Sequence, residues 1–316
     1  VNVGLKQTLY HNKVKGFIYT LLGVLKAAFS LRKGDVLLLQ YPLKKYFSIL
    51  CKIAHLKGAT VIALVHDLGS FRRKKLSAAE EKKRLSNADY IIALNIVMKN
   101  WLIEQGYNQP MSTLDVWDYL SESKPMNESK VDLSDISKIL YAGSLGRKRN
   151  SFIYSLDSYF SDESFKLVTY GGDMDWDSIT HKDKFENKGY VTSDEIIETS
   201  NGTFGLVWAG HSIEEMTGEY GEYLRINTSH KASLYIRCHV PLIVWEESAF
   251  AVFVRENNIG VCISSLKELN SILTNLTNSE YQIMKQNVIA VSDKISKGFY
   301  FLNAYTEIEN TLLDNK

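Results

Sequence analysis

The sequence predicts an α/β protein of two domains with parallel sheets, and three observations support this prediction. Short apolar runs end in glycine or polar residues, a pattern typical of parallel strands that are covered on both faces. These runs alternate with segments in which apolar residues recur at helical spacing. A chain of 316 residues with 45% hydrophobic and 23% charged residues suits two ordinary globular domains.

The first half contains three apolar runs with helical segments around them. The predicted strands are 35–42, 60–67 and 88–95, and the predicted helices are 11–31, 44–57 and 97–104. Ligands of open α/β sheets bind beyond the carboxyl ends of the strands, so His66 and Asp67 should line one rim of a cleft. They are candidates for a catalytic base and the group that orients it. Adjacent strand residues point to opposite faces, which leaves open that one of them is structural.

The second half follows a polar stretch with Pro and Ser at 121–135, which we interpret as a linker. Its predicted strands are 137–144, 165–172, 187–192, 204–208 and 240–245, with helices that begin near Ser193 and His230 and a helical tail over 297–313. Between the strand at 204–208 and the helix near His230, Gly218 and Gly221 interrupt what reads as a polar loop.

The residues before the helix at His230 predict an anion site. Asn227, Thr228 and Ser229 are three good N-caps in a row, so Lys231 falls in the first turn of the helix. The helix dipole makes a lysine mildly unfavourable there. A bound phosphate would remove this conflict, because the free amides, the dipole and the ammonium group would all face the same anion.

A second basic segment follows the strand at 137–144. Gly143 and Ser144 turn the chain, and Arg147 and Arg149 come directly after them. Forked arginine donors suit a diphosphate, while a solvated basic loop is an equally good interpretation.

Composition excludes several other classes of protein. A formal net charge of +1 gives no sign of a nucleic-acid-binding protein. The sequence also has no GxGxxG motif of the kind that begins a dinucleotide-binding fold. Cys51, Cys238 and Cys262 are an odd number in apolar settings, which favours buried thiols over disulfides. The apolar run at 17–25 is shorter than the ~20 residues of a membrane span.

Two charged motifs leave alternatives open. Asp173 and Asp175 form an Asp-x-Asp pair that could hold a divalent metal, but acidic residues after Gly-Gly are common in turns, so we expect no metal site. The charged segments 72–75 and 80–84 read by default as a solvated loop and helix. A basic patch for anionic lipid is the alternative for 72–75.

The chain resembles a known family over nearly its whole length. The second half carries GLVW, then SIEEMTGEYGEYLRINTSHKASLYI, then VPLIVWEESAFAVFVRENNIGV, and the first half carries HDLGSFR and ADYIIALNIVMKNWL. These motifs are similar to those of bacterial galactofuranosyltransferases and of a related glucosyltransferase that extends sugar on serine-rich adhesins.

The resemblance implies a fold and a division of labour. It implies the GT-B fold, with two Rossmann-like domains that face each other across a cleft. We expect an acceptor-binding domain at 1–122, a nucleotide-sugar-binding domain at 136–296, and a C-terminal helix at 297–316 that crosses back to the first domain. The residues expected to bind UDP are Gly143, Ser144, Arg147, Arg149, Tyr170, Tyr190, Val191, Gly218, Glu222, Asn227, His230 and Lys231.

The resemblance also implies a reaction and its partners. The donor would be a UDP-sugar, used without a metal or other cofactor, and the acceptor a glycan or a polyprenyl-linked glycan. The place of action would be the cytoplasm, and peripheral contact with the inner face of the plasma membrane and homo-oligomerisation stay open. A nucleotide-sugar epimerase and a binding protein that closes on its ligand are the competing interpretations.

Three positions depart from the family pattern. Leu94 stands where the family usually has His, and Ala209 stands where it usually has Asp. The paired glutamates of many retaining GT-B enzymes correspond by spacing to Asn227 and Leu234 here, which weakens the case for retention.

Overall fold

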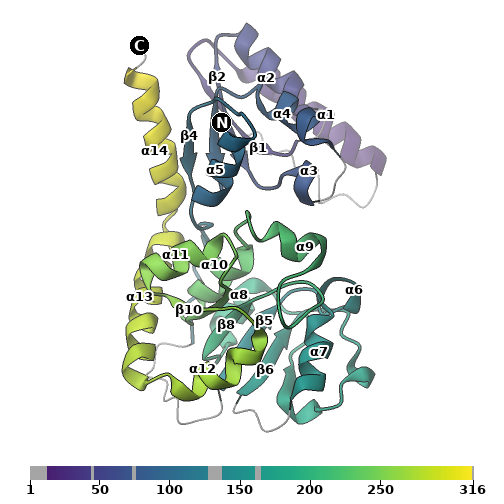
Figure 1. Ribbon diagram of the computed structural model, residues 1–316. Helices are drawn as coiled ribbons and strands as arrows, with labels where there is room; N and C mark the ends of the chain where they lie inside the picture. Colours follow the sequence, from purple (N-terminus) through teal and green to yellow (C-terminus); the bar gives the residue numbers. More distant parts are fainter. Residues whose placement is uncertain (1–12, 44–45, 73–75, 127–136, 161–164, 315–316) are drawn as a thin grey trace. The chain divides into compact units, whose positions relative to one another are not determined.

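The computed structural model describes residues 13–43, 46–72, 76–126, 137–160 and 165–314 (Figure 1). The chain divides into two compact units. Unit 1 holds the described residues up to Ala93, Lys99–Thr113 and the described residues from Glu307 onward, and unit 2 holds Leu94–Met98 and Leu114–Thr306. Each unit is built on its own parallel sheet, which confirms the predicted α/β class.

Unit 1 contains a four-stranded parallel sheet in the order β1-β2-β3-β4. Its strands are β1 (Val36–Tyr41), β2 (Thr60–Val65), β3 (Tyr90–Ala93) and β4 (Met111–Thr113). The strands β2 and β3 are almost wholly buried, as predicted. The edge strand β1 is buried only at Leu39 and Tyr41, while Val36 and Leu38 are each 39% exposed, so the predicted two-sided burial is wrong there. The short strand β4 was not predicted, since three residues are too few to show a period.

The helices of the N-terminal half follow the predicted order. They are α1 (Lys13–Ser30), α2 (Tyr46–Leu56), α3 (Gly69–Arg72), α4 (Ala78–Leu85) and α5 (Ile96–Glu104). Helix α1 packs against α2, which in turn packs against β2. Part of α1 stays exposed, including Val14 at 66% and Phe29 at 81%.

Helix α4 is not simply a solvated helix, because Glu81 is 1% exposed. Its carboxylate accepts hydrogen bonds from the Tyr41 hydroxyl at 3.0 Å and from the backbone amides of Gly69 at 2.7 Å and Ser70 at 2.9 Å. Buried carboxylates need such donors. Glu81 thereby ties the end of β1 to the start of α3. Of the predicted basic patch at 72–75, residues 73–75 lie outside the described residues.

Unit 2 contains a six-stranded sheet in the order β10-β9-β8-β5-β6-β7, with every pair parallel. Its strands are β5 (Ser137–Ala142), β6 (Phe165–Tyr170), β7 (Phe185–Asn187), β8 (Phe204–Val207), β9 (Leu242–Trp245) and β10 (Gly260–Ile263). The chain starts at β5, runs outward to β7, and returns to the other side of β5 with β8. This is the doubly wound order, and ligands of such sheets bind where the direction reverses, beside β5.

The helices of the C-terminal half include one in a segment that the sequence predicted to be a polar loop. They are α6 (Arg147–Asn150), α7 (Phe152–Tyr159), α8 (Ser193–Thr199), α9 (Gly218–Tyr223), α10 (His230–Arg237), α11 (Phe250–Asn257), α12 (Leu269–Asn275), α13 (Asn278–Ser296) and α14 (Phe299–Asp314). The expected glycine-rich polar loop is wrong in part, because α9 occupies its second half. The expected strand at 187–192 is also misplaced, since β7 ends at Asn187.

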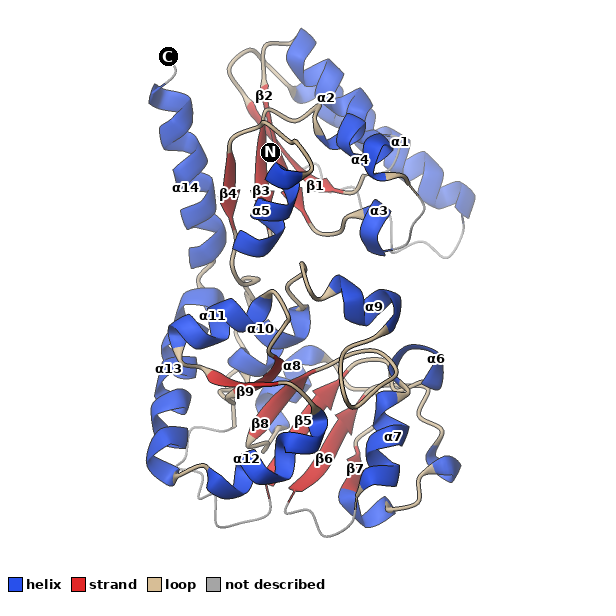
Figure 2. Cartoon of the chain, viewed as in Figure 1, coloured by secondary structure: helices blue, strands red, loops and turns tan. Residues whose placement is uncertain are grey.

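Both faces of the unit 2 sheet are covered (Figure 2). Successive residues of a strand point to opposite faces. On one face Ile139 and Tyr141 of β5 join a core with residues of α7 and α12. On the other face α10 packs against β8 and β9, and α10 also contacts α8 and α13. Gly205 of β8 allows this approach, since a Cβ there would lie 2.3 Å from the Tyr235 ring of α10.

The C-terminal helix α14 has a defined start. The Asp118 carboxylate accepts hydrogen bonds from the backbone amides of Tyr300 at 3.2 Å and Phe301 at 2.7 Å. These are amides of its first turn, which lack partners within the helix. From Glu307 onward the described residues of α14 belong to unit 1. Among the described helices none is both long enough and apolar enough to span a bilayer.

Candidate functional site

Three loops meet at the carboxyl ends of β5, β6 and β7. The Gly143 amide donates to the Tyr170 carbonyl at 2.8 Å, and the Gly171 amide donates to the Gly189 carbonyl at 2.7 Å. A Cβ on Gly171, whose φ is +151°, would lie 1.8 Å from the Gly143 carbonyl oxygen. Only glycine fits such a contact, so the close packing of these loops depends on it.

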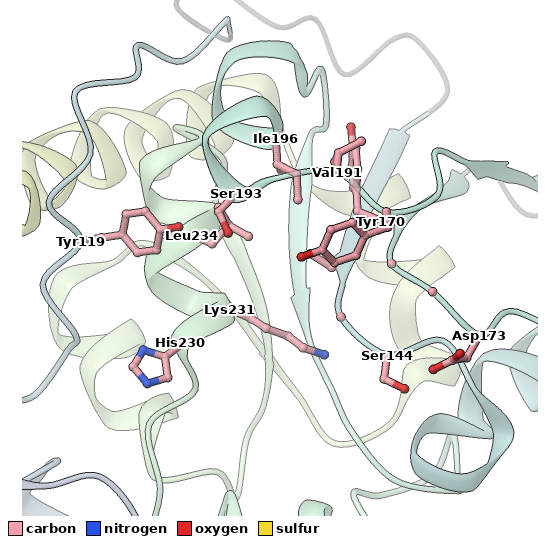
Figure 3. A pocket seen from close by; sticks show the side chains of 15 residues that line it. Tyr119, Ser144, Tyr170, Asp173, Val191, Ser193, Ile196, His230, Lys231 and Leu234 are labelled. Atoms are coloured by element: carbon pink, nitrogen blue, oxygen red, sulfur yellow. The ribbon is translucent and has the colours of Figure 1, made fainter. Parts of the chain in front are cut away.

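A pocket of about 560 Å³ opens among these loops and the start of α10 (Figure 3). All of its lining belongs to unit 2. The residues that line it are Tyr119, Ala142, Gly143, Ser144, Tyr170, Gly171, Gly172, Asp173, Tyr190, Val191, Ser193, Ile196, His230, Lys231 and Leu234. It lies beside β5, where doubly wound sheets bind ligands.

Helix α10 delivers Lys231 to this pocket. Ser229 is the N-cap and accepts a hydrogen bond from the Lys231 amide at 3.3 Å. Lys231 therefore lies in the first turn, as predicted, and its side chain extends into the pocket toward the segment that carries Ser144 (Figure 3). The end of the Lys231 side chain lies so close to the Gly143 backbone that a Cβ on Gly143 would lie 2.9 Å from the Lys231 Cε atom.

The Lys231 ammonium group has no anionic partner among the described residues. It forms none of the ion pairs of the described chain. Instead it donates to the Tyr141 hydroxyl at 2.8 Å and lies 3.9 Å from the centroid of that ring. Burial lowers the pKa of Lys231 to about 7, because the charged form is poorly solvated. A bound anion would restore the charged form.

The start of α10 is held in place by residues from two other segments. The Asn95 side-chain amide donates to the Thr228 hydroxyl at 2.9 Å and to the Ile226 carbonyl at 3.1 Å. The Trp117 indole donates to the Thr228 carbonyl at 3.1 Å, and its ring stacks on His230 with centroids 4.4 Å apart. These contacts fix the turn from which His230 and Lys231 project.

Seven of the predicted UDP-binding residues come together at this pocket. They are Gly143, Ser144, Tyr170, Tyr190, Val191, His230 and Lys231. Tyr190 is the most exposed of the large apolar residues among them, at 85%. Burial raises the pKa of Tyr170 to about 12, so its hydroxyl stays protonated at neutral pH.

Arg147 and Arg149 do not line the pocket. The Arg147 guanidinium donates to Ser178 at 2.6 Å, pairs with Asp175 at 3.3 Å and lies 3.9 Å over the Tyr154 ring. The Arg149 guanidinium lies 5.2 Å over the Tyr220 ring of α9.

Gly218, Glu222 and Asn227 also lie outside the pocket lining. Gly218 begins α9, and the exposed Glu222 pairs with Arg225 at 3.1 Å. The Asn227 side-chain oxygen is buried and has no hydrogen-bond partner among the described residues. Gly221 of α9 is needed for packing, since a Cβ would lie 2.6 Å from the Met216 backbone.

The predicted catalytic residues His66 and Asp67 belong to unit 1 and directly follow β2. Asp67 forms an ion pair with Arg72 of α3. Burial lowers the pKa of His66, and the charge of Asp67 opposes that shift.

Several lining residues were not predicted. Tyr119 and Ser193 had no assigned role. Tyr141, which contacts Lys231 but does not line the pocket, was seen only as a strand residue. Asp173 was read as a turn residue, which fits its φ of +67°, yet it also lines the pocket. No local signal marks these side chains, because their neighbours in the pocket are distant in sequence. Among the described residues no three His, Cys, Asp or Glu side chains gather as metal ligands.

Comparisons with protein families match both halves of the chain. The description "Glucosyltransferase 3-like, C-terminal domain" matches residues 139–308, and "Glucosyltransferase 3-like, N-terminal domain" matches residues 6–116. Among curated proteins, the beta-1,6-galactofuranosyltransferase WbbI of Escherichia coli (strain K12) is 29% identical over 289 residues, 89% of this chain and 81% of WbbI. Glucosyltransferase 3 of Streptococcus gordonii is 34% identical over 113 residues, 35% of this chain and 33% of that protein.

Solved structures agree in fold. The lipopolysaccharide outer core galactosyltransferase WaaB, in its apo form, superposes with a TM-score of 0.54 at 14% identity, over 92% of this chain and 81% of WaaB. Anabaena HepE, in complex with UDP and glucose, superposes with a TM-score of 0.55 at 12% identity, over 93% of this chain and 82% of HepE. At such identities the likeness shows the fold alone, and it confirms the expected GT-B fold.

Proposed function

This chain belongs to the glucosyltransferase 3-like family and is a glycosyltransferase; from that premise we propose that it transfers a hexose from a UDP-sugar to a glycan acceptor. The pocket of unit 2 binds the donor. The observation that carries the proposal is the state of Lys231. This half-buried residue lies in the first turn of α10, and its ammonium group has no anionic partner among the described residues. A diphosphate would satisfy the ammonium group, and the positive end of the helix dipole would favour the same anion.

The other lining residues fit the remaining parts of the donor. Gly143 brings bare backbone next to the Lys231 amine, so a phosphate can approach both. The exposed Tyr190 with its neighbour Val191 offers a surface for the uracil. HepE, whose fold is similar, was solved with UDP and glucose, which supports a UDP-sugar as the class of donor.

The reaction needs a cation for the leaving diphosphate and a base for the acceptor. Lys231, helped by Arg147 or Arg149, meets the charge that develops on the diphosphate and replaces a metal ion in this role. Asp67 or His66 deprotonates the acceptor hydroxyl, since both directly follow a buried strand of unit 1. Arg147 would have to leave Asp175 to take part.

Galactofuranose is our first choice of donor sugar, because WbbI is a galactofuranosyltransferase and matches 89% of this chain. Glucose is the alternative, since the matching family is named for a glucosyltransferase. A site that hydrogen-bonds the exocyclic diol of a furanose would reject a pyranose, because buried polar groups would be left unpaired. The acceptor is a glycan or polyprenyl-linked glycan of bacterial surface polysaccharide or glycoprotein assembly, reached from the cytoplasm at the inner face of the plasma membrane.

A donor screen tests this function. The protein is incubated with UDP-galactofuranose, UDP-glucose or UDP-galactose, each with and without alkyl glycosides or cell-derived polyprenyl-linked glycans, and products are read by mass spectrometry. A hexose added to an acceptor supports the proposal. A changed sugar without acceptor would instead indicate an epimerase, and no product with any donor would contradict the function. Transfer from UDP-glucose but not from UDP-galactofuranose would overturn only the donor.

A further inference from the structure

The hydrogen-bond acceptor of the Lys231 ammonium group is a neutral side chain, Tyr141. The ammonium group contacts both parts of Tyr141, the hydroxyl at 2.8 Å and the ring, whose centroid is 3.9 Å away. A ring face attracts a cation, and a hydroxyl oxygen accepts its proton. Tyr141 thus contacts the ammonium group through two different interactions.

Tyr141 itself is held by the packing of the unit 2 core. It is fully buried in the unit 2 core, and its ring packs edge-to-face on Phe152 with centroids 5.2 Å apart. Its hydroxyl lies 3.3 Å from the Trp208 carbonyl and donates its single hydrogen there. The oxygen lone pairs are therefore free to accept from Lys231. The carbonyl of Trp208 sets the direction in which the hydroxyl accepts.

A neutral partner also leaves the positive charge uncompensated. Burial raises the pKa of Tyr141 well above its ordinary value, so the phenol carries no charge in the neutral range. A carboxylate in the same place would hold the ammonium group but would cancel its attraction for an anion. The neutral Tyr141 can hold the Lys231 ammonium group without reducing the attraction of that group for a diphosphate.

We propose that Tyr141 is a positioning residue that fixes the Lys231 ammonium group beside the Gly143 backbone before the donor binds. A free lysine chain has many rotamers, and holding it in one of them before binding removes that entropic cost from the binding step. This inference rests on the proposed function, because it assumes that Lys231 meets the diphosphate.

Two substitutions of Tyr141 separate the contribution of its hydroxyl to UDP binding from that of its ring. Tyr141→Phe keeps the ring and removes the hydroxyl, and Tyr141→Leu removes both. Tyr281→Phe is the matched control, because Tyr281 is equally buried in the same core and donates to the Thr203 carbonyl at 2.9 Å, outside the pocket lining. The readout is the Kd of UDP, measured by calorimetry from pH 6.5 to 9.

Tyr141→Phe should weaken UDP binding roughly five- to tenfold at pH 7, the cost of one hydrogen bond. The pH above which affinity falls should move lower, because the ammonium form has lost a stabilising acceptor. Tyr141→Leu should show both effects more strongly, and Tyr281→Phe neither. If Tyr141→Phe behaves like Tyr281→Phe in affinity and pH profile, the positioning role is overturned.

Two further measurements keep the outcomes distinct. If Lys231→Met binds UDP as the wild type does, the proposed diphosphate site itself fails, whereas loss of binding in Lys231→Met with normal binding in Tyr141→Phe refutes only the positioning role. Should the Tyr141 variants not fold, NMR of the wild type decides. A Lys231 ε-methylene shifted upfield by the ring current supports the contact, and an unshifted signal overturns it.

Discussion

Replacing Lys231 by methionine removes the charge and nearly keeps the length and apolar character of the side chain. A charge-assisted hydrogen bond contributes about 1.5–3 kcal/mol. At an effective dielectric constant of ~20, two unit charges ~4 Å apart attract by about 4 kcal/mol, which sets an upper limit.

The protonation state of Lys231 slightly reduces the free energy that its ammonium group contributes to UDP binding. Burial lowers its pKa to about 7, so about half of the free protein must take up a proton at pH 7 before it binds an anion. That costs about 0.4 kcal/mol from RT ln 2. We therefore expect Lys231→Met to weaken UDP binding by about 2 kcal/mol, which is roughly 30-fold in Kd.

The pH dependence has a definite sign. The diphosphate binds the ammonium form, so binding takes up a proton in the fraction of molecules whose amine is neutral. The affinity of the wild type should fall as pH rises above about 7, approaching tenfold per pH unit while the complex stays protonated. In Lys231→Met this slope should be absent.

Calorimetric titration with UDP at pH 6.5, 7.5 and 8.5 measures both effects. Lys166→Met is the matched control, because Lys166 lies at the start of β6, at the opposite end of that strand from the pocket residue Tyr170. A Lys231→Met protein that binds UDP within twofold of the wild type at pH 7 would refute this reasoning. So would a pH slope that persists in the variant.

Other expected outcomes concern the glycine beside Lys231, the base and the metal. Gly143→Ala should weaken UDP binding at least tenfold, since its Cβ would lie 2.9 Å from the Lys231 Cε atom; circular dichroism checks the fold, and unchanged affinity would argue against the site. Asp67→Asn or His66→Ala should lower kcat by about 10²-fold or more while the Kd of UDP stays constant; if neither slows transfer to an accepted acceptor, the base lies elsewhere. EDTA should leave the transfer rate within about twofold if Lys231 replaces the metal; a loss of activity that Mg²⁺ restores would contradict this.

Several features of this protein follow from the sequence by itself. Apolar runs and helical spacing predicted β2, β3, β5, β6, β8 and β9 because period and burial are encoded locally. The first-turn position of Lys231 was also predictable, since Ser229 caps its helix through a contact two residues away.

The arrangement around Lys231 was decided only by the tertiary structure. Tyr141 and Gly143 meet the lysine across about ninety positions of sequence, and no local pattern indicates such a contact. The basic segment with Arg147 looked as suitable for a diphosphate as Lys231 did, yet Arg147 pairs with Asp175. Ion pairing and burial depend on which distant residues the fold brings together. The same contacts decide whether a basic side chain is already paired with a carboxylate or stays available to bind an anionic ligand.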